Sequence, residues 1–526
     1  MLRVLISDPL HPEGEALLKT ETEVDVRLGL TPDELLELIG DYDALVVRSE
    51  TKVTENVLKA GQRLQVIGRA GVGVDNIDLD AATRLGITVV NAPTGNTVAA
   101  AEHTIALMLS LARNIPQAHQ SLVQGNWARN TFVGTEIREK VLGIVGLGRV
   151  GSEVALRARG LQMKLVGYDP FVTPEYSQRL GIRLVSFEEL LAESDFVTLH
   201  TPMTDNTHHL IGEKELKLVK PSVRIINCAR GNLIDEKALF TALEEKRIAG
   251  VALDVFAKEP PGDNPLLLHP NVVATPHLGA STAEAQAEVG RQAAEQILLV
   301  LRGEPAPYTA NVSFAIPETQ RMLAPYVPVS TTIAKLATQL VEGQLTSVTI
   351  RYQGEIAQHD TSMLKAAVLA GVLEPITSTR VNLVNAILLA SQRGLRVVEE
   401  KSEDDSEHYG SLITVQMHTS QGTTSVSGTV MRGESHIVKI EDYWVDIIPS
   451  TEYLLFTYHQ DHPGLIGSVG TITGAHDINI SFMEVARLAP RGDAAMILGL
   501  DDSIPEPVME ELRSIPLIGK VKLARL

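Results

Sequence analysis

The chain has 526 residues with 46 basic and 65 acidic side chains, giving a formal net charge of −19. At roughly 100–200 residues per domain, this length predicts three or four domains. A hydrophobic content of 44% excludes a disordered chain, and so negative a charge without a basic stripe argues against a nucleic-acid partner. The single cysteine, Cys228, can form neither an intrachain disulfide nor a zinc cluster, so we expect no metal and a reducing, cytoplasmic compartment. We expect neither a leader nor a membrane span, because no run of about 18 mainly apolar residues exists.

Short β-branched runs alternate with longer helical patterns through the first 300 residues or so. Near-continuous apolar strands between helices predict parallel sheets that are covered on both faces. Ten such strands are too many for one mononucleotide-type sheet, so we predict two doubly wound domains, a discontinuous one at 1–96 and 282–305 and another at 97–281. The ten predicted strands are residues 3–7, 44–47, 65–68, 87–91, 141–146, 164–169, 196–200, 223–227, 249–254 and 272–276.

Two long helices flank the second set of strands. The first is expected at 97–113, with Asn96 or Thr97 as its cap, and the second at 281–303, which ends at a glycine. Such a pair suits a chain that leaves the first domain and later returns to it.

The alternation of strand and helix patterns ends after this second helix. The proline-containing residues 304–317 are predicted to be a linker. Residues 311–450 mix strands and helices, including a hairpin, and form an intervening α+β domain. Residues 453–526 follow the order βαββαβ, which predicts a ferredoxin-like domain. The fold class is therefore α/β with two doubly wound parallel-sheet domains, followed by these two smaller units.

A glycine fingerprint follows the strand at 141–146. Gly146, Gly148 and Gly151 open a helix, and the next strand ends at Asp169, as a dinucleotide-binding turn requires. Asp169 would accept hydrogen bonds from ribose hydroxyls and repel a 2′-phosphate, so NAD is expected rather than NADP. The alternative is that Asp169 only forms an ordinary turn at the end of its strand.

Three later strand ends carry the groups that oxidation of a 2-hydroxy acid requires. Arg230 can bind a carboxylate, His277 can take the hydroxyl proton, and Glu259 can fix the histidine tautomer. Each has a plainer interpretation, since Arg230 could be a surface ion-pair partner, Glu259 could be solvated and His277 could cap a helix. Cys228 is interpreted as a small buried residue.

The segments GRAGVGVDNID, GLGRVG, HTPMTDNTHHLI, NCARGNLIDE, ALDVFAKEP and PHLGAST resemble the D-isomer-specific 2-hydroxyacid dehydrogenases, over residues 1 to about 305. The resemblance implies catalytic roles for Arg230, Glu259 and His277, a substrate-binding domain at 1–96 and 282–305 and a Rossmann NAD-binding domain at 97–281. Beside the glycines and Asp169, it implies that NAD contacts Arg149, Val150, Thr201, Cys228, Ala229, Arg230, Asp254, His277, Gly279 and Ala280.

The order of domains is similar to the long form within this family, in which an intervening domain and a C-terminal ACT domain follow the catalytic half. That resemblance implies a homotetramer that binds the effector L-serine between ACT domains through Asp461, Gly464 and Asn479. His459 stands where some serine-binding relatives have a tyrosine. Asp461 could instead only cap the helix that follows it.

The resemblance also implies the substrate, D-3-phosphoglycerate, which NAD would oxidise to 3-phosphohydroxypyruvate in the first step of L-serine biosynthesis. Arg48, Arg69 and Asn96 would join Arg230 in binding this doubly anionic acid. Three alternatives stay open: a related dehydrogenase acting on glyoxylate, hydroxypyruvate or 2-oxoglutarate, a non-catalytic NAD-sensing co-regulator, and a serine-binding protein.

Overall fold

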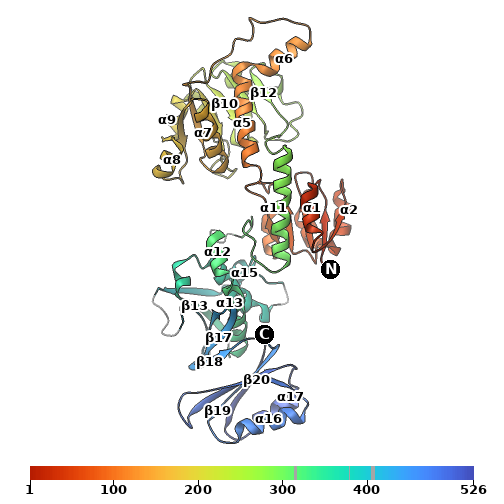
Figure 1. The fold of residues 1–526 in the computed structure, drawn as a ribbon, viewed down its shortest axis with the longest axis vertical. Helices are drawn as coiled ribbons and strands as arrows, with labels where there is room; N and C mark the ends of the chain where they lie inside the picture. The colour runs from red at the N-terminus through yellow and green to blue at the C-terminus, as the bar shows by residue number, and fades with distance from the viewer. Residues whose placement is uncertain (313–316, 378–379, 404–408) are drawn as a thin grey trace.

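The structure is a computed structural model that describes residues 1–312, 317–377, 380–403 and 409–526. Four β-sheets follow one another along the long axis of the molecule (Figure 1). The sheet formed by strands within residues 141–274 lies at one end of the molecule. The N-terminal sheet follows it, and the two C-terminal sheets complete the row. This arrangement confirms the predicted fold class.

The N-terminal sheet is parallel, with strand order β2-β1-β3-β4-β5. Its inner strands are apolar and buried, as the sequence pattern predicted, whereas β2 was missed because its sequence EVDV is acidic and only half-buried at the sheet edge. The strands are β1 (Arg3–Ile6), β2 (Glu23–Val26), β3 (Ala44–Val47), β4 (Val66–Arg69) and β5 (Thr88–Val90), and the helices are α1 (Pro12–Leu18), α2 (Pro32–Leu38), α3 (Glu55–Ala60), α4 (Leu79–Arg84) and the returning α11 (Ala283–Leu301).

The second sheet is also parallel and has the order β12-β11-β10-β9-β6-β7-β8. Successive strands are added on one side of β6 and then on the other, so the topological switch point, where open α/β sheets bind ligands, lies between β6 and β9. The two-residue edge strand β8 was not predicted. The strands are β6 (Val141–Val145), β7 (Lys164–Tyr168), β8 (Arg183–Leu184), β9 (Phe196–Leu199), β10 (Arg224–Asn227), β11 (Gly250–Leu253) and β12 (Val272–Ala274), and the helices are α5 (Thr97–Arg113), α6 (Ile115–Val123), α7 (Arg149–Gly160), α8 (Pro174–Leu180), α9 (Phe187–Glu193) and α10 (Glu236–Glu244).

The chain crosses between these two sheets twice. It leaves the first through residues 91–96 into α5 and returns through residues 275–282 into α11. The first crossing contacts α11, since Thr94 Oγ1 donates a hydrogen bond to Gln292 Oε1 on this helix at 2.9 Å. Asn96 is the N-cap residue of α5, as predicted, but its side chain makes no capping hydrogen bond.

The first part of the predicted linker is docked on the N-terminal sheet. Thr309 pairs with Val90 as an isolated antiparallel bridge, and Val89 N donates to the Asn311 side chain at 2.9 Å. Because β5 is an edge strand, it offers backbone groups that this segment can satisfy. Residues 304–312 are therefore not a free tether, and residues 313–316 lie outside the described part of the chain.

The third sheet is mixed and has the order β14-β13-β15-β16-β17-β18. The predicted hairpin is confirmed as the antiparallel pair β15 and β16. The strands are β13 (Leu345–Gly354), β14 (Arg396–Ser402), β15 (Ser411–Thr419), β16 (Gly422–Met431), β17 (Glu434–Ile440) and β18 (Tyr443–Ile447), and the helices are α12 (Pro317–Leu323), α13 (Tyr326–Leu340), α14 (Ser362–Leu373) and α15 (Ala386–Gln392).

The fourth sheet is antiparallel, with the order β20-β21-β19-β22 that a ferredoxin-like βαββαβ unit requires. Its elements are β19 (Tyr453–Gln460), α16 (Leu465–Ala475), β20 (Ile480–Arg487), β21 (Asp493–Leu500), α17 (Glu506–Arg513) and β22 (Ile518–Arg525). One hydrophobic core joins it to the third sheet, because Phe456 and Ile497 pack in the same cluster as Ile333 and Val415. The two C-terminal units therefore hold each other in place.

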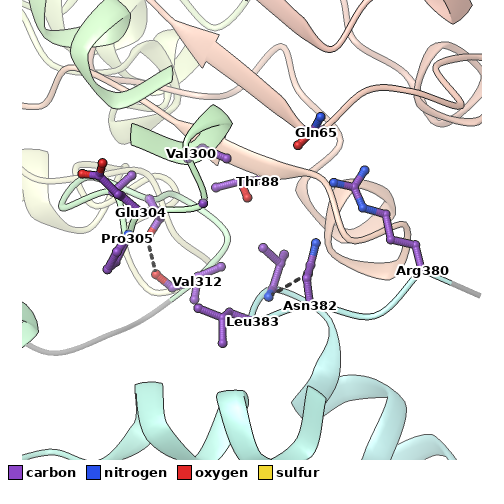
Figure 2. Close-up of a pocket in the computed structure, with 13 residues that line it drawn as sticks. Gln65, Thr88, Val300, Glu304, Pro305, Val312, Arg380, Asn382 and Leu383 are labelled. Atoms are coloured by element: carbon purple, nitrogen blue, oxygen red, sulfur yellow. Dashed lines mark hydrogen bonds between the residues drawn. The ribbon is translucent and has the colours of Figure 1, made fainter. Parts of the chain in front are cut away.

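A cavity of about 240 Å³ lies where the third unit meets the N-terminal sheet (Figure 2). Beside it, the Arg380 guanidinium donates to Leu64 O at 2.9 Å, and the Asn382 amide donates to Gly86 O at 2.7 Å. These bonds join the third unit to the segments that enter β4 and β5. Among the described residues, no helix is both long and apolar enough to cross a bilayer.

The packing of α1 on α11 depends on a glycine. A Cβ on Gly14 would lie 2.6 Å from the Gly290 carbonyl oxygen, which belongs to backbone that cannot easily yield. We expect Gly14→Val to destabilise the N-terminal unit by about 1–3 kcal/mol, the usual cost of overpacking, and to lower the first calorimetric transition. Gly160→Ala in α7 is the control, because nothing lies within 4 Å of its added methyl. Equal melting of both variants would contradict this account.

Candidate active site

The turn between β6 and α7 requires glycine at two positions. Gly146 has a φ of +91°, and a Cβ there would lie 2.6 Å from His200 O. A Cβ on Gly151 would lie 2.0 Å from Gly146 O. Gly148, the N-cap residue of α7, has open space around it, so a ligand can approach the backbone there. The strand, turn and helix therefore have the form of a phosphate-binding turn.

Asp169, immediately after β7, supports this turn and lines a cavity. Its Oδ2 accepts a hydrogen bond from Leu147 N at 2.8 Å, and its Oδ1 accepts one from Phe171 N at 2.9 Å. The second bond is the local turn contact that the plainer interpretation expected. The same carboxylate also faces a cavity of about 470 Å³ that runs from Gly146 and Gly148 past Thr201.

A buried hydroxyl in this cavity lacks a partner. Thr201 Oγ1 is inaccessible to solvent and forms no hydrogen bond with any described residue. Burial of such a group normally requires a partner, and a bound ligand can supply one. The neighbouring His200 is neutral near pH 7, since burial lowers its pKa to about 3. The glycine turn, a carboxylate at ribose position and an unsatisfied hydroxyl fit a dinucleotide.

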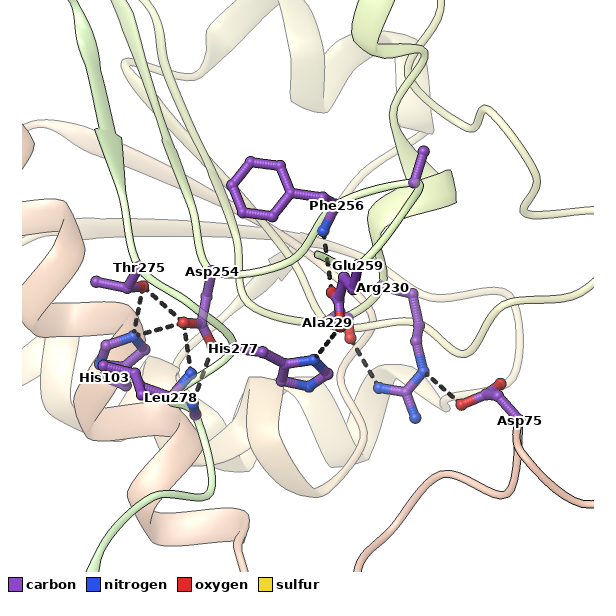
Figure 3. Close-up of polar contacts among 12 residues, drawn as sticks. Asp75, His103, Ala229, Arg230, Asp254, Phe256, Glu259, Thr275, His277 and Leu278 are labelled. Carbon is purple, nitrogen blue, oxygen red and sulfur yellow. Dashed lines mark hydrogen bonds and ion pairs between the residues drawn. The ribbon is translucent and has the colours of Figure 1, made fainter. Parts of the chain in front are cut away.

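His277 and Glu259 form a hydrogen-bonded pair at the other side of the cleft (Figure 3). His277 Nδ1 lies 2.7 Å from Glu259 Oε2, and Glu259 Oε1 accepts a hydrogen bond from Phe256 N at 3.1 Å. Because Nδ1 is engaged, Nε2 is the ring nitrogen left to face a substrate. His277 does not cap α11, whose N-cap is Thr282.

The contact between His277 and Glu259 moves their two pKa values in opposite directions. The hydrogen bond with Glu259 raises the pKa of His277 above its ordinary value, although burial opposes this. Burial works to raise the pKa of Glu259, but the hydrogen bonds from His277 and Phe256 hold it below its ordinary value. Glu259 is therefore ionised near pH 7 and fixes the proton of neutral His277 on Nδ1.

Asp254 has no solvent exposure and supports the turn that carries His277. Its Oδ1 accepts hydrogen bonds from Thr275 Oγ1 at 2.6 Å and Leu278 N at 2.7 Å, while its Oδ2 accepts one from Gly279 N at 2.8 Å. Burial opposes ionisation of Asp254, but these bonds and one from His103 hold its pKa below the ordinary value.

Arg230 lies at the end of β10 and reaches across the cleft. Its Nε lies 3.4 Å from Asp75 Oδ2 in the N-terminal unit, and one guanidinium nitrogen donates to Ala229 O at 2.7 Å. A Cβ on Gly73 would lie 2.2 Å from the Arg230 guanidinium, so this glycine leaves room for it. The ion pair with Asp75 bridges the two sheets that form the cleft.

Two further arginines belong to this cluster. Arg69 Nε donates to Arg48 O at 3.1 Å, which brings the ends of β4 and β3 together. Burial, followed by the charges of Arg230 and Arg48, lowers the pKa of Arg69 to about 10, whereas Asp75 has the opposite effect. Arg69 is still protonated near neutral pH, so three guanidinium groups concentrate positive charge at this edge.

The other predicted residues surround the same cleft. Arg149 donates to Pro93 O at 3.2 Å, linking the glycine turn to the first crossing. Burial raises the pKa of the Cys228 thiol to about 12, which makes it unreactive near neutral pH. Val150 is the second residue of α7, while Ala229 and Ala280 follow β10 and β12 and Asn96 precedes α5.

The predicted effector residues lie apart from this cleft and have partners within their own unit. Asp461 Oδ2 accepts hydrogen bonds from the Arg487 guanidinium and Arg491 N, both at 3.1 Å. Asn479 Nδ2 donates to Asp501 Oδ2 at 2.6 Å. Gly464, with a φ of +98°, is the N-cap of α16, and no side chain caps this helix, so Asp461 does not. His459 is buried.

Sequence reasoning missed three residues of the site. Asp75 and Asn76 stand inside the GVGVDNID segment, and Asn76 Nδ2 donates to Arg48 O and Thr51 O at 2.9 and 2.6 Å. The segment was noticed, but its polar pair was not interpreted. His103 lies within the predicted helix at 97–113, where no motif marks it, so only its tertiary contacts reveal it.

Comparisons with known proteins agree with this geometry. The sequence profile described as D-isomer specific 2-hydroxyacid dehydrogenase, NAD binding domain, matches residues 105–279, and that of the D-3-phosphoglycerate dehydrogenase intervening domain matches residues 322–441. The D-3-phosphoglycerate dehydrogenase of Synechocystis sp. is 45% identical over 517 residues, which cover 98% of this chain and 93% of that protein.

A second relative and a solved structure extend the comparison. The D-3-phosphoglycerate dehydrogenase of Methanocaldococcus jannaschii is 44% identical over 527 residues, covering 100% of both chains. A solved Thermus thermophilus protein superposes with a TM-score of 0.55 at 35% identity, covering 59% of this chain and 100% of that one.

The position of Asp169 predicts which nucleotide the cavity prefers. We expect Asp169→Asn to tighten NADP binding by about tenfold, because it removes a charge that would stand near a 2′-phosphate. Titration calorimetry with NAD and NADP would measure both dissociation constants. Glu188→Gln, which removes an exposed carboxylate from α9, is the matched control. If Asp169→Asn leaves the NADP affinity unchanged, Asp169 does not set the preference.

Proposed function

Because this chain belongs to the D-3-phosphoglycerate dehydrogenases of the D-isomer-specific 2-hydroxyacid dehydrogenase family, we propose that it oxidises D-3-phosphoglycerate to 3-phosphohydroxypyruvate with NAD. This is the first step of phosphorylated L-serine biosynthesis. The observation that carries the proposal is the cleft itself, in which a paired His277 and Glu259 face three clustered arginines.

The substrate carries a carboxylate and a phosphate, and the cleft offers a cation for each. Arg230 binds the carboxylate, and Arg48 and Arg69 bind the phosphate, with Asn96 as a neutral donor beside the first crossing. Arg230 now pairs with Asp75, so a substrate carboxylate takes over part of the contact that Asp75 makes. Bidentate contact with a guanidinium orients the acid for reaction.

The hydroxyl proton passes to His277. Its Nε2 accepts the proton, and Glu259 stabilises the resulting imidazolium through Nδ1. Asp254 holds the turn on which His277 stands. NAD held at the glycine turn would supply the hydride acceptor for the carbinol carbon. The residues that would bind NAD are Gly146, Gly148, Arg149, Val150, Gly151, Asp169, Thr201, Cys228, Ala229, Arg230, Asp254, His277, Gly279 and Ala280.

Contacts between the two catalytic units support closure around the substrate. The Asp75–Arg230 ion pair and the Arg149–Pro93 hydrogen bond both cross the cleft. Closure would exclude water from the reacting atoms. We assign the substrate-binding domain to 1–96 and 282–305, the NAD-binding domain to 97–281, the intervening domain to 311–450 and the ACT domain to 453–526.

Regulation and assembly form the finer part of the proposal. L-serine would bind the ACT domain near Asp461, Gly464 and Asn479, where Asp461 must exchange Arg487 for the effector ammonium. The homotetramer is proposed by analogy with the family, and contact between subunits would cover exposed apolar side chains on α6 and the loop after it, where Trp127 is 80% exposed and Val123 is 72% exposed. A cytoplasmic location is supported by the single cysteine.

The proposal is tested by following NADH absorbance with 3-phosphoglycerate, glycerate, hydroxypyruvate and 2-hydroxyglutarate, each with and without L-serine. We expect 3-phosphoglycerate to give the highest kcat/KM and His277→Ala to lower kcat by roughly 10²-fold. Full turnover by His277→Ala would contradict the mechanism. A higher kcat/KM with another acid would contradict the assignment of 3-phosphoglycerate as the substrate. A lack of inhibition by L-serine would contradict its assignment as the effector.

The His277–Glu259 pair predicts a pH effect. Oxidation needs neutral His277, so activity rises as pH increases through its pKa. Glu259→Gln removes the partner that raises this pKa, so the acidic limb of kcat/KM should move to lower pH while the maximal rate falls by roughly tenfold or more. Glu188→Gln, which changes an exposed carboxylate of the same unit, is the comparison. A limb that stays in place would show that Glu259 does not set the titration of His277.

A further inference from the structure

His103 lies in the second turn of α5 and points into the active site. Its Nε2 lies 3.1 Å from both Asp254 Oδ1 and Thr275 Oγ1 (Figure 3). The His103 side chain is 19% exposed and that of Asp254 is fully buried. Because a carboxylate only accepts hydrogen bonds and Thr275 gives its own proton to Asp254, Nε2 carries the proton in this contact.

Asp254 transmits this contact to the turn that carries His277. The side chain of Asp254 accepts hydrogen bonds from Leu278 N and Gly279 N, and its backbone carbonyl accepts one from His277 N at 2.8 Å. His277 has a φ of +55°, in the left-handed region that is strained for a histidine. Such a conformation persists only where its surroundings hold it, and Asp254 supplies three of the bonds that do so.

The contact also joins the two crossings between the sheets. His103 belongs to the helix that begins at the first crossing, while Thr275 and the His277 turn belong to the second. His103 can therefore keep the turn that carries His277 at a fixed position relative to α5 when the two units close.

We propose that His103 is a positioning residue for catalysis: it orients the buried Asp254 carboxylate, which in turn fixes the turn that presents His277 to the substrate. The proposal rests on the function proposed above, in which His277 takes the hydroxyl proton. In this assignment His103 acts on the reaction through Asp254.

The charges around His277 give the proposal an electrostatic consequence. The charged groups that act on His277 are Glu259 and Asp254, which raise its pKa, and Arg230, which lowers it. Asp254 in turn interacts with His103 and with the protonated thiol of Cys228. A hydrogen bond from His103 disperses the charge of Asp254, so removal of this donor strengthens the effect of Asp254 on His277. Loss of His103 should therefore move the acidic limb of the pH profile to higher pH.

The experiment compares His103→Leu, which removes the donor, with His103→Gln, whose amide can donate from a similar position. Glu102→Gln, a change of the exposed neighbour on α5, is the matched control. We expect His103→Leu to lower kcat roughly tenfold, to leave KM for 3-phosphoglycerate within about twofold, and to move the limb upward. His103→Gln should restore most of the rate and the wild-type limb, and Glu102→Gln should match the wild type.

Hydrogen–deuterium exchange of residues 275–280 in the protein without substrate provides a readout that does not depend on the reaction. Faster exchange in His103→Leu, but not in His103→Gln, is expected. The proposal would be overturned if His103→Leu kept the wild-type kcat, the wild-type acidic limb of the pH profile and the wild-type hydrogen–deuterium exchange. It would also be overturned if His103→Leu lowered kcat without moving the acidic limb and His103→Gln did not restore kcat. If the wild type does not oxidise 3-phosphoglycerate, the proposed function fails, while the exchange result still decides whether His103 holds the turn.

Discussion

Parallel strands place all their carboxyl ends at one edge of a sheet, and the catalytic half of this molecule depends on that constraint. Arg69 is the last residue of β4, while Asp169 follows β7, Arg230 follows β10 and His277 follows β12, so residues distant in the chain come to the carboxyl ends of the two sheets. Two crossings, one into α5 and one into α11, bring the edges of two such sheets together. The topology of the two sheets therefore sets the position of the site, and the side chains at that position set its chemistry.

The arginines clustered in that cleft carry a charge opposite in sign to the net charge of the molecule. The chain carries −19 overall, yet three arginines gather where a doubly anionic substrate would bind. Acidic residues nearby have separate tasks: Asp75 holds Arg230, Glu259 holds His277, and Asp254 is buried beneath the catalytic turn. Each carboxylate is satisfied by hydrogen bonds or an ion pair, which allows ionised groups to stand close together without neutralising one another by proton transfer.

The C-terminal half is coupled to this cleft through packing. One core runs through the third and fourth sheets, and the third unit hydrogen-bonds to Leu64 and Gly86, at the entrances of β4 and β5. Those strands lead directly to Arg69 and to the first crossing. A change in the C-terminal half thus has a short physical route to the clustered arginines, although Asp461 and Asn479 are paired within their own unit.

Local patterns of residues were enough to predict several elements of the fold and of the site. Apolar runs predicted the inner strands, the spacing of Gly146, Gly148 and Gly151 predicted the nucleotide turn, and helix α5 was located to the residue. Short or acidic edge strands such as β2 and β8 lack that pattern because edge positions bury little apolar surface. The docked segment at 304–312 resembled a linker because the bonds that dock it on β5, such as Val89 N to Asn311, are with residues distant in the sequence. Tertiary structure alone decided that Asp75 meets Arg230 and that His103 meets Asp254, 151 residues away. Such contacts depend on the geometry of the two crossings, which no local pattern of residues records.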